Sequence, residues 1–277
     1  MKFHILFGVL LVSCSISKNT TSPLSNHFPS VLVKPDILPE KENFYLYILA
    51  GQSNMAGRGF VQPEDTVSST RVLTLNQDNI WVYAKEPLHY YESSRTGLDC
   101  GLSFGKEMTA KLKDSITVGL IPCAVGGSSI EQWINDSTYR GVTLYKNLLE
   151  KIRIASQSGK VKGILWHQGE SNAGITSYVD FKLKVESFFK KLRKDVHQED
   201  LPVFAGQLGS FLSRTAYPNA DLVNNDLKKL SKSMPDFYLV KTKNLTHKPD
   251  TVHFDTESQR ILGKLYAKSV LKELKVK

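Results

Sequence analysis

Cysteine is scarce in this sequence, with three residues among 277. A chain of this length can bury a large hydrophobic core without disulfide bonds. Cys14 lies at the end of an N-terminal apolar run, which leaves Cys100 and Cys123. Those two either form one disulfide, or Cys123 is a small buried residue at the end of an apolar strand. The spacing of the two cysteines does not decide between these alternatives.

Long hydrophobic runs are also missing, apart from residues 3–12. That run is too short to span a bilayer as a mature helix and is typical of an export signal. Its end, Leu11-Val12-Ser13-Cys14, resembles the bacterial lipobox, in which the cysteine is lipidated and becomes residue one of the mature protein. We therefore expect a signal peptide over 1–14 with lipidation at Cys14, a flexible tether over 15–40 and a folded domain over 41–277. The protein is then exported, and either lipid-anchored to the cell envelope or periplasmic or secreted.

Several other signals are absent, and each absence excludes a class of function. The formal charge is +9, but no basic stripe interleaved with aromatic residues is present, which argues against nucleic-acid binding. No histidine or cysteine cluster has metal-ligand spacing, so we expect neither a metal nor another cofactor. No internal repeat follows residue 40, and no long apolar segment suggests an acyl channel.

Short apolar segments alternate with amphipathic ones along the domain. Strands are expected over residues 44–50, 116–124, 163–167, 203–208 and 237–241, and helices over 102–112, 142–156, 178–196, 221–233 and 256–274. This alternation is typical of an α/β fold in which helices cover both faces of a parallel sheet. Residues 58–101 are irregular, with a short strand pair expected around 80–84 or an excursion that shapes the site.

Four polar loops lie beside the ends of the predicted strands: Gly51-Gln52-Ser53-Asn54, Ala124–Ser129, His167–Asn172 and Asp250–Phe254. The carboxyl ends of parallel strands form the ligand-binding edge of such sheets, so these loops are expected to converge. A serine nucleophile needs an imidazole base, a third group that orients the base, and N–H donors for the oxyanion. The four loops contain all of these groups, although Ser53 alone could also be a helix N-cap.

The same motifs resemble those of the SGNH hydrolases, and more narrowly the sialate O-acetylesterase-type domain and carbohydrate esterase family six. The resemblance covers about residues 44–271 and implies a three-layer α/β/α sandwich with a mainly parallel, flavodoxin-like sheet. It assigns Ser53 as nucleophile and His253 as general base. Asp250 is the expected acid of the triad, because it lies on the same loop as His253, and Glu170 is the alternative acid.

The resemblance also implies an oxyanion hole made by the backbone N–H of Ser53, the N–H of Gly126 and the side-chain amide of Gln168. Gly127 replaces Gly126 if the register shifts by one residue, and Gln168 could instead make a structural hydrogen bond to the Ser53 loop. Asn54 and Trp133 are the expected substrate-binding residues. Core packing is the alternative for Trp133.

The expected activity is that of a serine esterase which removes O-acetyl groups from carbohydrate. Acetylated xylan or a related plant polysaccharide is the first expected substrate, and an O-acetylated sialic acid is the second. A non-catalytic carbohydrate-binding surface lipoprotein is the alternative from another class. The expected partners are an acetylated oligo- or polysaccharide and, through the lipid anchor only, a membrane; the oligomeric state is left open.

Overall fold

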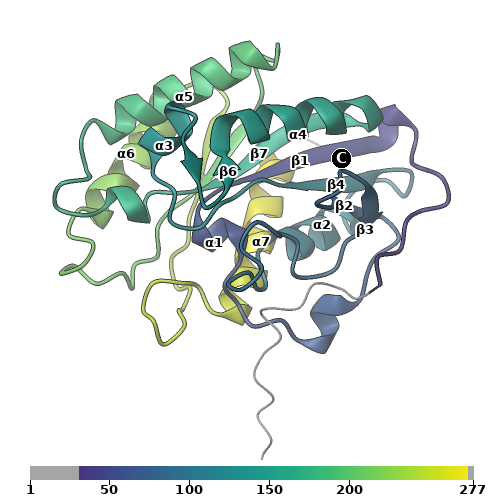
Figure 1. Ribbon diagram of the computed structural model, residues 1–277, viewed down its shortest axis with the longest axis horizontal. Helices are drawn as coiled ribbons and strands as arrows, with labels where there is room; N and C mark the ends of the chain where they lie inside the picture. Colours follow the sequence, from purple (N-terminus) through teal and green to yellow (C-terminus); the bar gives the residue numbers. More distant parts are fainter. Residues whose placement is uncertain (1–30, 274–277) are drawn as a thin grey trace, which may run out of the picture.

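Strand β1 (Phe44–Gly51) lies at the centre of a seven-stranded sheet in the computed structural model, which describes residues 31–273 (Figure 1). The strand order is β3-β2-β4-β1-β7-β8-β9. The other strands are β2 (Val72–Leu75), β3 (Trp81–Tyr83), β4 (Thr117–Pro122), β7 (Lys160–His167), β8 (Val203–Gly206) and β9 (Phe237–Val240). Only β3, which pairs with β2, runs antiparallel. The predicted parallel sheet and short strand pair are confirmed.

Helices cover both faces of this sheet, which confirms the predicted three-layer sandwich (Figure 1). One face packs against α3 (Ile130–Ile134), α4 (Leu144–Ser158), α5 (Phe181–Asp195) and α6 (Ala220–Ser233). The other packs against α1 (Ser53–Ala56), α2 (Gly101–Thr109) and α7 (Thr256–Glu273). Strand β1 explains why both layers are needed: Leu46 and Ile48 enter one core, while Tyr47 and Leu49 enter the other. Such a strand is stable only when both of its faces are buried.

The strand order changes direction at β1. From β1 the chain passes to β2, β3 and β4 on one side, and then crosses to β7, β8 and β9 on the other. The loops that follow β1, β4 and β7 therefore meet at one edge of the sheet. A crevice forms outside the carboxyl ends of the strands at such a switch point.

Some short elements escape the periodicity of the sequence. They are a two-stranded hairpin, β5 (Thr138–Tyr139) with β6 (Val142–Thr143), and the 3-10 turns η1 (Lys41–Asn43), η2 (Pro63–Thr66) and η3 (Glu170–Asn172). Two to four residues are too few to display a helical or strand period. The hairpin carries Arg140 at its turn and thereby contributes to the site described below.

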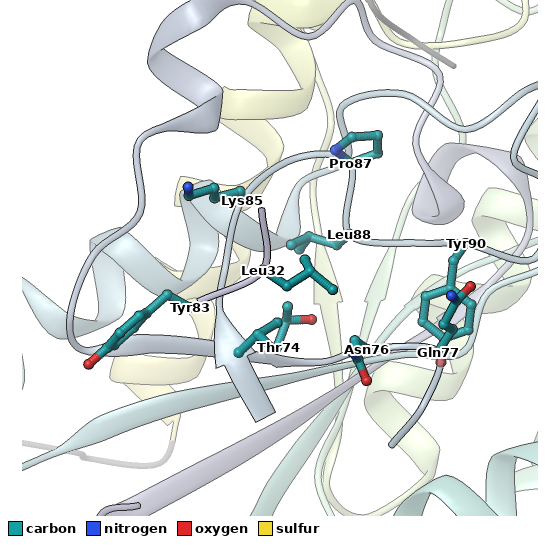
Figure 2. A pocket seen from close by; sticks show the side chains of 10 residues that line it. Leu32, Thr74, Asn76, Gln77, Tyr83, Lys85, Pro87, Leu88 and Tyr90 are labelled. Carbon is teal, nitrogen blue, oxygen red and sulfur yellow. The ribbon is translucent and has the colours of Figure 1, made fainter. Parts of the chain in front are cut away.

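The segment 31–40, which belongs to the predicted tether, is irregular and mostly exposed, and it contacts the domain. The Val33 carbonyl accepts a 2.9 Å hydrogen bond from the Tyr83 N–H of β3. Leu32 points into a pocket of about 190 Å³ that it shares with Thr74 and Leu88 (Figure 2). The segment therefore covers part of an otherwise open sheet edge.

The predicted signal peptide and the predicted lipidation site, Cys14, lie outside the described residues. Between residues 31 and 273, no helix combines the length and the hydrophobicity needed to cross a bilayer. Cys100 and Cys123 are both buried and both free thiols. The structure thus supports the buried, unpaired alternative for these two cysteines.

Candidate active site

The turn from β1 into α1 depends on Gly51. Its φ of +133° is unfavourable for residues with a side chain, and a Cβ at this position would overlap the His167 carbonyl of β7. Gln52 is the N-cap of α1, and its carbonyl accepts the N–H groups of Met55 and Ala56. Ser53 is therefore the first helical residue rather than the N-cap, which leaves its hydroxyl available for other contacts.

Ser53, His253 and Asp250 form one hydrogen-bonded chain. Ser53 Oγ lies 2.9 Å from His253 Nε2, and His253 Nδ1 lies 2.9 Å from Asp250 Oδ2. Asp250 Oδ1 also accepts the N–H groups of Val252 and His253, each at 2.9 Å. The loop before α7 therefore fixes the carboxylate and the imidazole together. In this geometry the imidazole can take the serine proton while the carboxylate stabilises the resulting cation.

Asp250, and not Glu170, is the acid that contacts the imidazole. Burial tends to raise the pKa of Asp250, but its bonds from His253 and Val252 outweigh burial and lower that pKa, so the carboxylate is ionised. Glu170 is 3% exposed and accepts a 2.5 Å hydrogen bond from Asn54 Nδ2. Burial raises the pKa of Glu170, which favours a neutral carboxyl group. Glu170 lines the cleft, but the geometry gives the orienting role to Asp250.

The protonation of His253 predicts the acid limb of the pH profile. Burial lowers the pKa of His253 below the ordinary 6.5. The positive charges of Arg58 and Lys248 lower it further, whereas the negative charge of Asp250 raises it. A base must be neutral to act, so we expect kcat/KM to fall only below pH 6.5. In Lys248→Gln one lowering charge is lost, the pKa of His253 rises, and the acid limb moves to higher pH. Initial rates between pH 4 and 8 measure the limb; a limb that moves to lower pH in the variant contradicts this account.

Asn54 joins the serine loop to the histidine loop. It is 1% exposed. Its Nδ2 donates to the Val252 carbonyl at 3.2 Å, and its Oδ1 accepts the Phe254 N–H at 3.0 Å. These two residues flank His253, so Asn54 clamps the backbone on both sides of the base. Asn54 was expected to contact substrate. Its side-chain amide instead makes these internal hydrogen bonds.

Replacing Asn54 with Ala removes this clamp and leaves buried polar groups without partners. We expect kcat to fall roughly 10²-fold, because small misplacements of reacting groups are costly, and the unfolding free energy to fall by about 2 kcal/mol. The ester 4-nitrophenyl acetate and thermal unfolding measure the two effects. Asn224→Ala is the control, since Asn224 clamps the backbone of Leu208 in a similar way. Equal kcat losses in the two variants would mean that Asn54 acts only through stability.

The backbone N–H of Gly126 already has a hydrogen-bond partner. Its N–H donates a 2.6 Å hydrogen bond to Glu92 Oε2, and a Cβ at this position would overlap Arg58 and Glu92. The expected oxyanion contact of Gly126 is therefore replaced by an internal one. Gly127 lines the same cleft with φ +81°, and its N–H donates to no other atom of residues 31–273. Within the glycine pair, Gly127 is thus the residue whose amide is available.

Gln168 and Trp133 also differ from expectation. The Gln168 side chain is fully buried, and its Nε2 donates to Asn172 at 2.7 Å and to Gln52 at 3.4 Å. Gln168 therefore joins the loop after β7 to the Ser53 loop. This is the structural role that was considered as the alternative to an oxyanion contact. Trp133 is also fully buried, donates to Ser128 Oγ at 2.9 Å and packs edge-on against Trp166. Neither side chain offers a surface to substrate, because core packing and internal hydrogen bonds use both.

Ser53 and His253 line a cleft of about 440 Å³. This volume is within the range of small-ligand sites. Three arginines line it: Arg58 after α1, Arg95 between β3 and α2, and Arg140 in the β5–β6 hairpin. Glu92 lies behind them and forms ion pairs with Arg58, at 3.0 Å, and with Arg140. Burial opposes ionisation of Glu92, but these charges and the Gly126 N–H lower its pKa, so the carboxylate is charged.

Sequence analysis did not find these four residues. Arg58, Glu92 and Arg95 belong to the irregular segment that was expected only to shape the site, and Arg140 belongs to a hairpin without a periodic signal. The partners Arg58 and Glu92 are 34 residues apart, and Glu92 and Arg140 are 48 apart. No local spacing rule connects residues at such separations.

Comparison with known proteins places this site in a family. Residues 43–272 match the family model described as carbohydrate esterase, sialic acid-specific acetylesterase. This chain belongs to that family. The esterase class expected from the motifs is thereby confirmed, and the family region includes every residue of the Ser53–His253–Asp250 chain.

Individual relatives agree with this assignment. The chain is 30% identical, over 86% of its length and 94% of the relative's, to a probable carbohydrate esterase of Arabidopsis thaliana. A crystal structure of an Arabidopsis thaliana protein superposes with a TM-score of 0.73 at 29% identity, covering 84% of this chain and 99% of that one. A carbohydrate acetylesterase from Xanthomonas citri shares the fold, with a TM-score of 0.60 at 19% identity over 83% of this chain and 55% of its own.

The carbohydrate esterase site described here consists of organic side chains and backbone groups. Across residues 31–273, no group of three or more His, Cys, Asp or Glu side chains is arranged to hold a metal ion.

Proposed function

We propose that this carbohydrate esterase removes O-acetyl groups from sugars, with Ser53 as nucleophile, His253 as general base and Asp250 as the orienting acid. The hydrogen bonds that join these three side chains, two of which (Ser53 and His253) line a ligand-sized cleft, are the observation that carries the proposal. The non-catalytic lipoprotein alternative does not explain why His253 is held by both its ring and its backbone in a geometry suited to proton transfer.

In the proposed reaction, Ser53 Oγ attacks the acetyl carbonyl carbon while its proton passes to His253 Nε2. The oxyanion accepts hydrogen bonds from the backbone N–H groups of Ser53 and Gly127; one such donor is worth about 3 kcal/mol. His253 then gives the proton to the departing sugar oxygen, and the ester C–O bond breaks. Water then gives a proton to His253 and attacks the carbonyl carbon of the acetyl-serine. The bond between that carbon and Ser53 Oγ breaks, His253 returns the proton to Ser53 Oγ, and acetate is released.

The charge of the cleft bears on the choice between the two expected substrates. The xylan backbone is neutral, whereas sialic acid carries a carboxylate. Arg58, Arg95 and Arg140 line the cleft, and Glu92 is the acid that pairs with two of them. A cleft with surplus positive charge attracts anionic ligands. This observation favours an O-acetylated acidic sugar over acetylated xylan.

Acetate release by the full chain tests the proposal. We expect release from O-acetylated sialic acid at a higher kcat/KM than from acetylated xylan. Release from xylan alone would preserve the esterase assignment but reverse the choice of sugar. Failure to release acetate from either sugar and from 4-nitrophenyl acetate, by a protein shown to be folded, would refute the proposed activity.

A further inference from the structure

The three arginines that line the cleft differ in whether they form ion pairs within the protein. Arg58 is 8% exposed and donates to Glu92 at 3.0 Å and to the Gly57 carbonyl at 2.7 Å. Arg140 donates to the other oxygen of the same carboxylate. Glu92 therefore neutralises one of these two charges and restrains both side chains. Neither guanidinium is fully available to a ligand.

Arg95 is the exception. Its side chain is exposed, lines the cleft and makes no ion pair with any acid of residues 31–273. Its backbone is nonetheless well fixed, because the N–H groups of Arg95 and Thr96 donate to the Glu92 carbonyl at 2.7 and 2.9 Å. The Thr96 hydroxyl, also buried, donates to the same carbonyl at 2.7 Å. A tight turn thus fixes the backbone of Arg95, and its guanidinium, which forms no ion pair among residues 31–273, lines the cleft.

We infer that Arg95 is a specificity-determining residue that binds a carboxylate of the substrate while the acetyl ester lies at Ser53. A guanidinium recognises a carboxylate through two parallel, charge-assisted hydrogen bonds. The ligand class is therefore an O-acetylated sugar acid. This inference rests on the proposed function and assigns its preference for acidic sugars to one side chain.

The inference predicts that loss of Arg95 affects kcat/KM for acidic substrates but not for neutral ones. Removal of one charge-assisted contact is expected to lower kcat/KM for O-acetylated sialic acid roughly 10- to 100-fold in Arg95→Ala, chiefly through KM. Because Arg95 does not contact the acetyl group in this arrangement, kcat/KM for acetylated xylo-oligosaccharide and for 4-nitrophenyl acetate stays within about twofold. Arg95→Lys keeps the charge without the planar fork and is expected to fall between the wild type and Arg95→Ala.

The experiment compares the wild-type chain, Arg95→Ala, Arg95→Lys and the control Arg153→Ala on all three substrates. Arg153 is exposed on α4, away from the residues that line the cleft, and reports the effect of lower net charge alone. Equal losses on acidic and neutral substrates, or an unchanged KM for the acidic one, would overturn the inference. Wild-type activity on the neutral esters with none on the acidic sugar would overturn it while leaving the esterase proposal intact. Inactivity of the wild type on all three would instead refute the proposed function.

Discussion

Replacing Ser53 with Ala is expected to lower kcat for acetyl esters by at least roughly 10⁴-fold, the scale seen when a serine nucleophile is removed from a triad. Without the hydroxyl no acetyl-enzyme forms, and His253 has no proton to accept from residue 53. The fold is expected to persist, because α1 begins through the Gln52 carbonyl and not through the Ser53 side chain. Acetate release measures turnover, and thermal unfolding measures stability.

Ser231→Ala provides the matched control for this variant. Ser231 lies on α6, and among residues 31–273 its hydroxyl bonds only to the Lys228 carbonyl of the same helix. This variant is expected to retain wild-type turnover. A folded Ser53→Ala protein with undiminished turnover would show that another group attacks the ester, and the assignment of Ser53 as nucleophile would be abandoned.

The second large effect is expected from Asp250→Asn, with a loss in kcat of roughly 10⁴-fold. The amide cannot stabilise the imidazolium, and its NH₂ group favours the wrong tautomer of His253. Both backbone bonds to Asp250 Oδ1 can be kept by the amide oxygen, so the loop is expected to remain in place. Rates on 4-nitrophenyl acetate at pH 7 and above measure the loss.

Glu170→Gln is the comparison that decides between the two acids. A glutamine oxygen can still accept the hydrogen bond from Asn54. Burial raises the pKa of Glu170. We expect less than a roughly tenfold change in kcat, because Glu170 is not the group bonded to His253. A loss in Glu170→Gln as large as that in Asp250→Asn would return the orienting role to Glu170.

The sequence was informative where local pattern controls structure. Apolar strands such as 44–50 and amphipathic helices such as 178–196 occur as predicted, as β1 and α5, because a buried face imposes a period on its residues. The loops that contain Ser53, His253 and Asp250 follow or border such strands, and the resemblance of their motifs to those of the SGNH hydrolases implied the roles of the three residues. Their meeting follows from the parallel topology, in which carboxyl ends share an edge.

The direction of individual side chains was not predictable in the same way. Trp133, Gln168 and Asn54 lie near the motifs in sequence, yet all three point into the interior. A residue next to a catalytic loop can face either the cleft or the core, and polar type does not decide which. Gly126 shows the same limit, since the carboxylate that occupies its N–H comes from Glu92 in an irregular segment. Long-range ion pairs of this kind depend on tertiary packing alone.

The clamp made by Asn54 also bears on the order in which the protein becomes competent during synthesis. Ser53 and His253 are 200 residues apart, and Gln259 of α7 donates to the Asn54 carbonyl at 3.0 Å. A domain generally folds as a unit during synthesis. A nascent chain that already contains β1, β4 and β7 therefore has its serine but neither the base nor the helix that secures it. Because Asp250 and His253 lie so late in the sequence, polypeptides that end before them are expected to be inert towards esters.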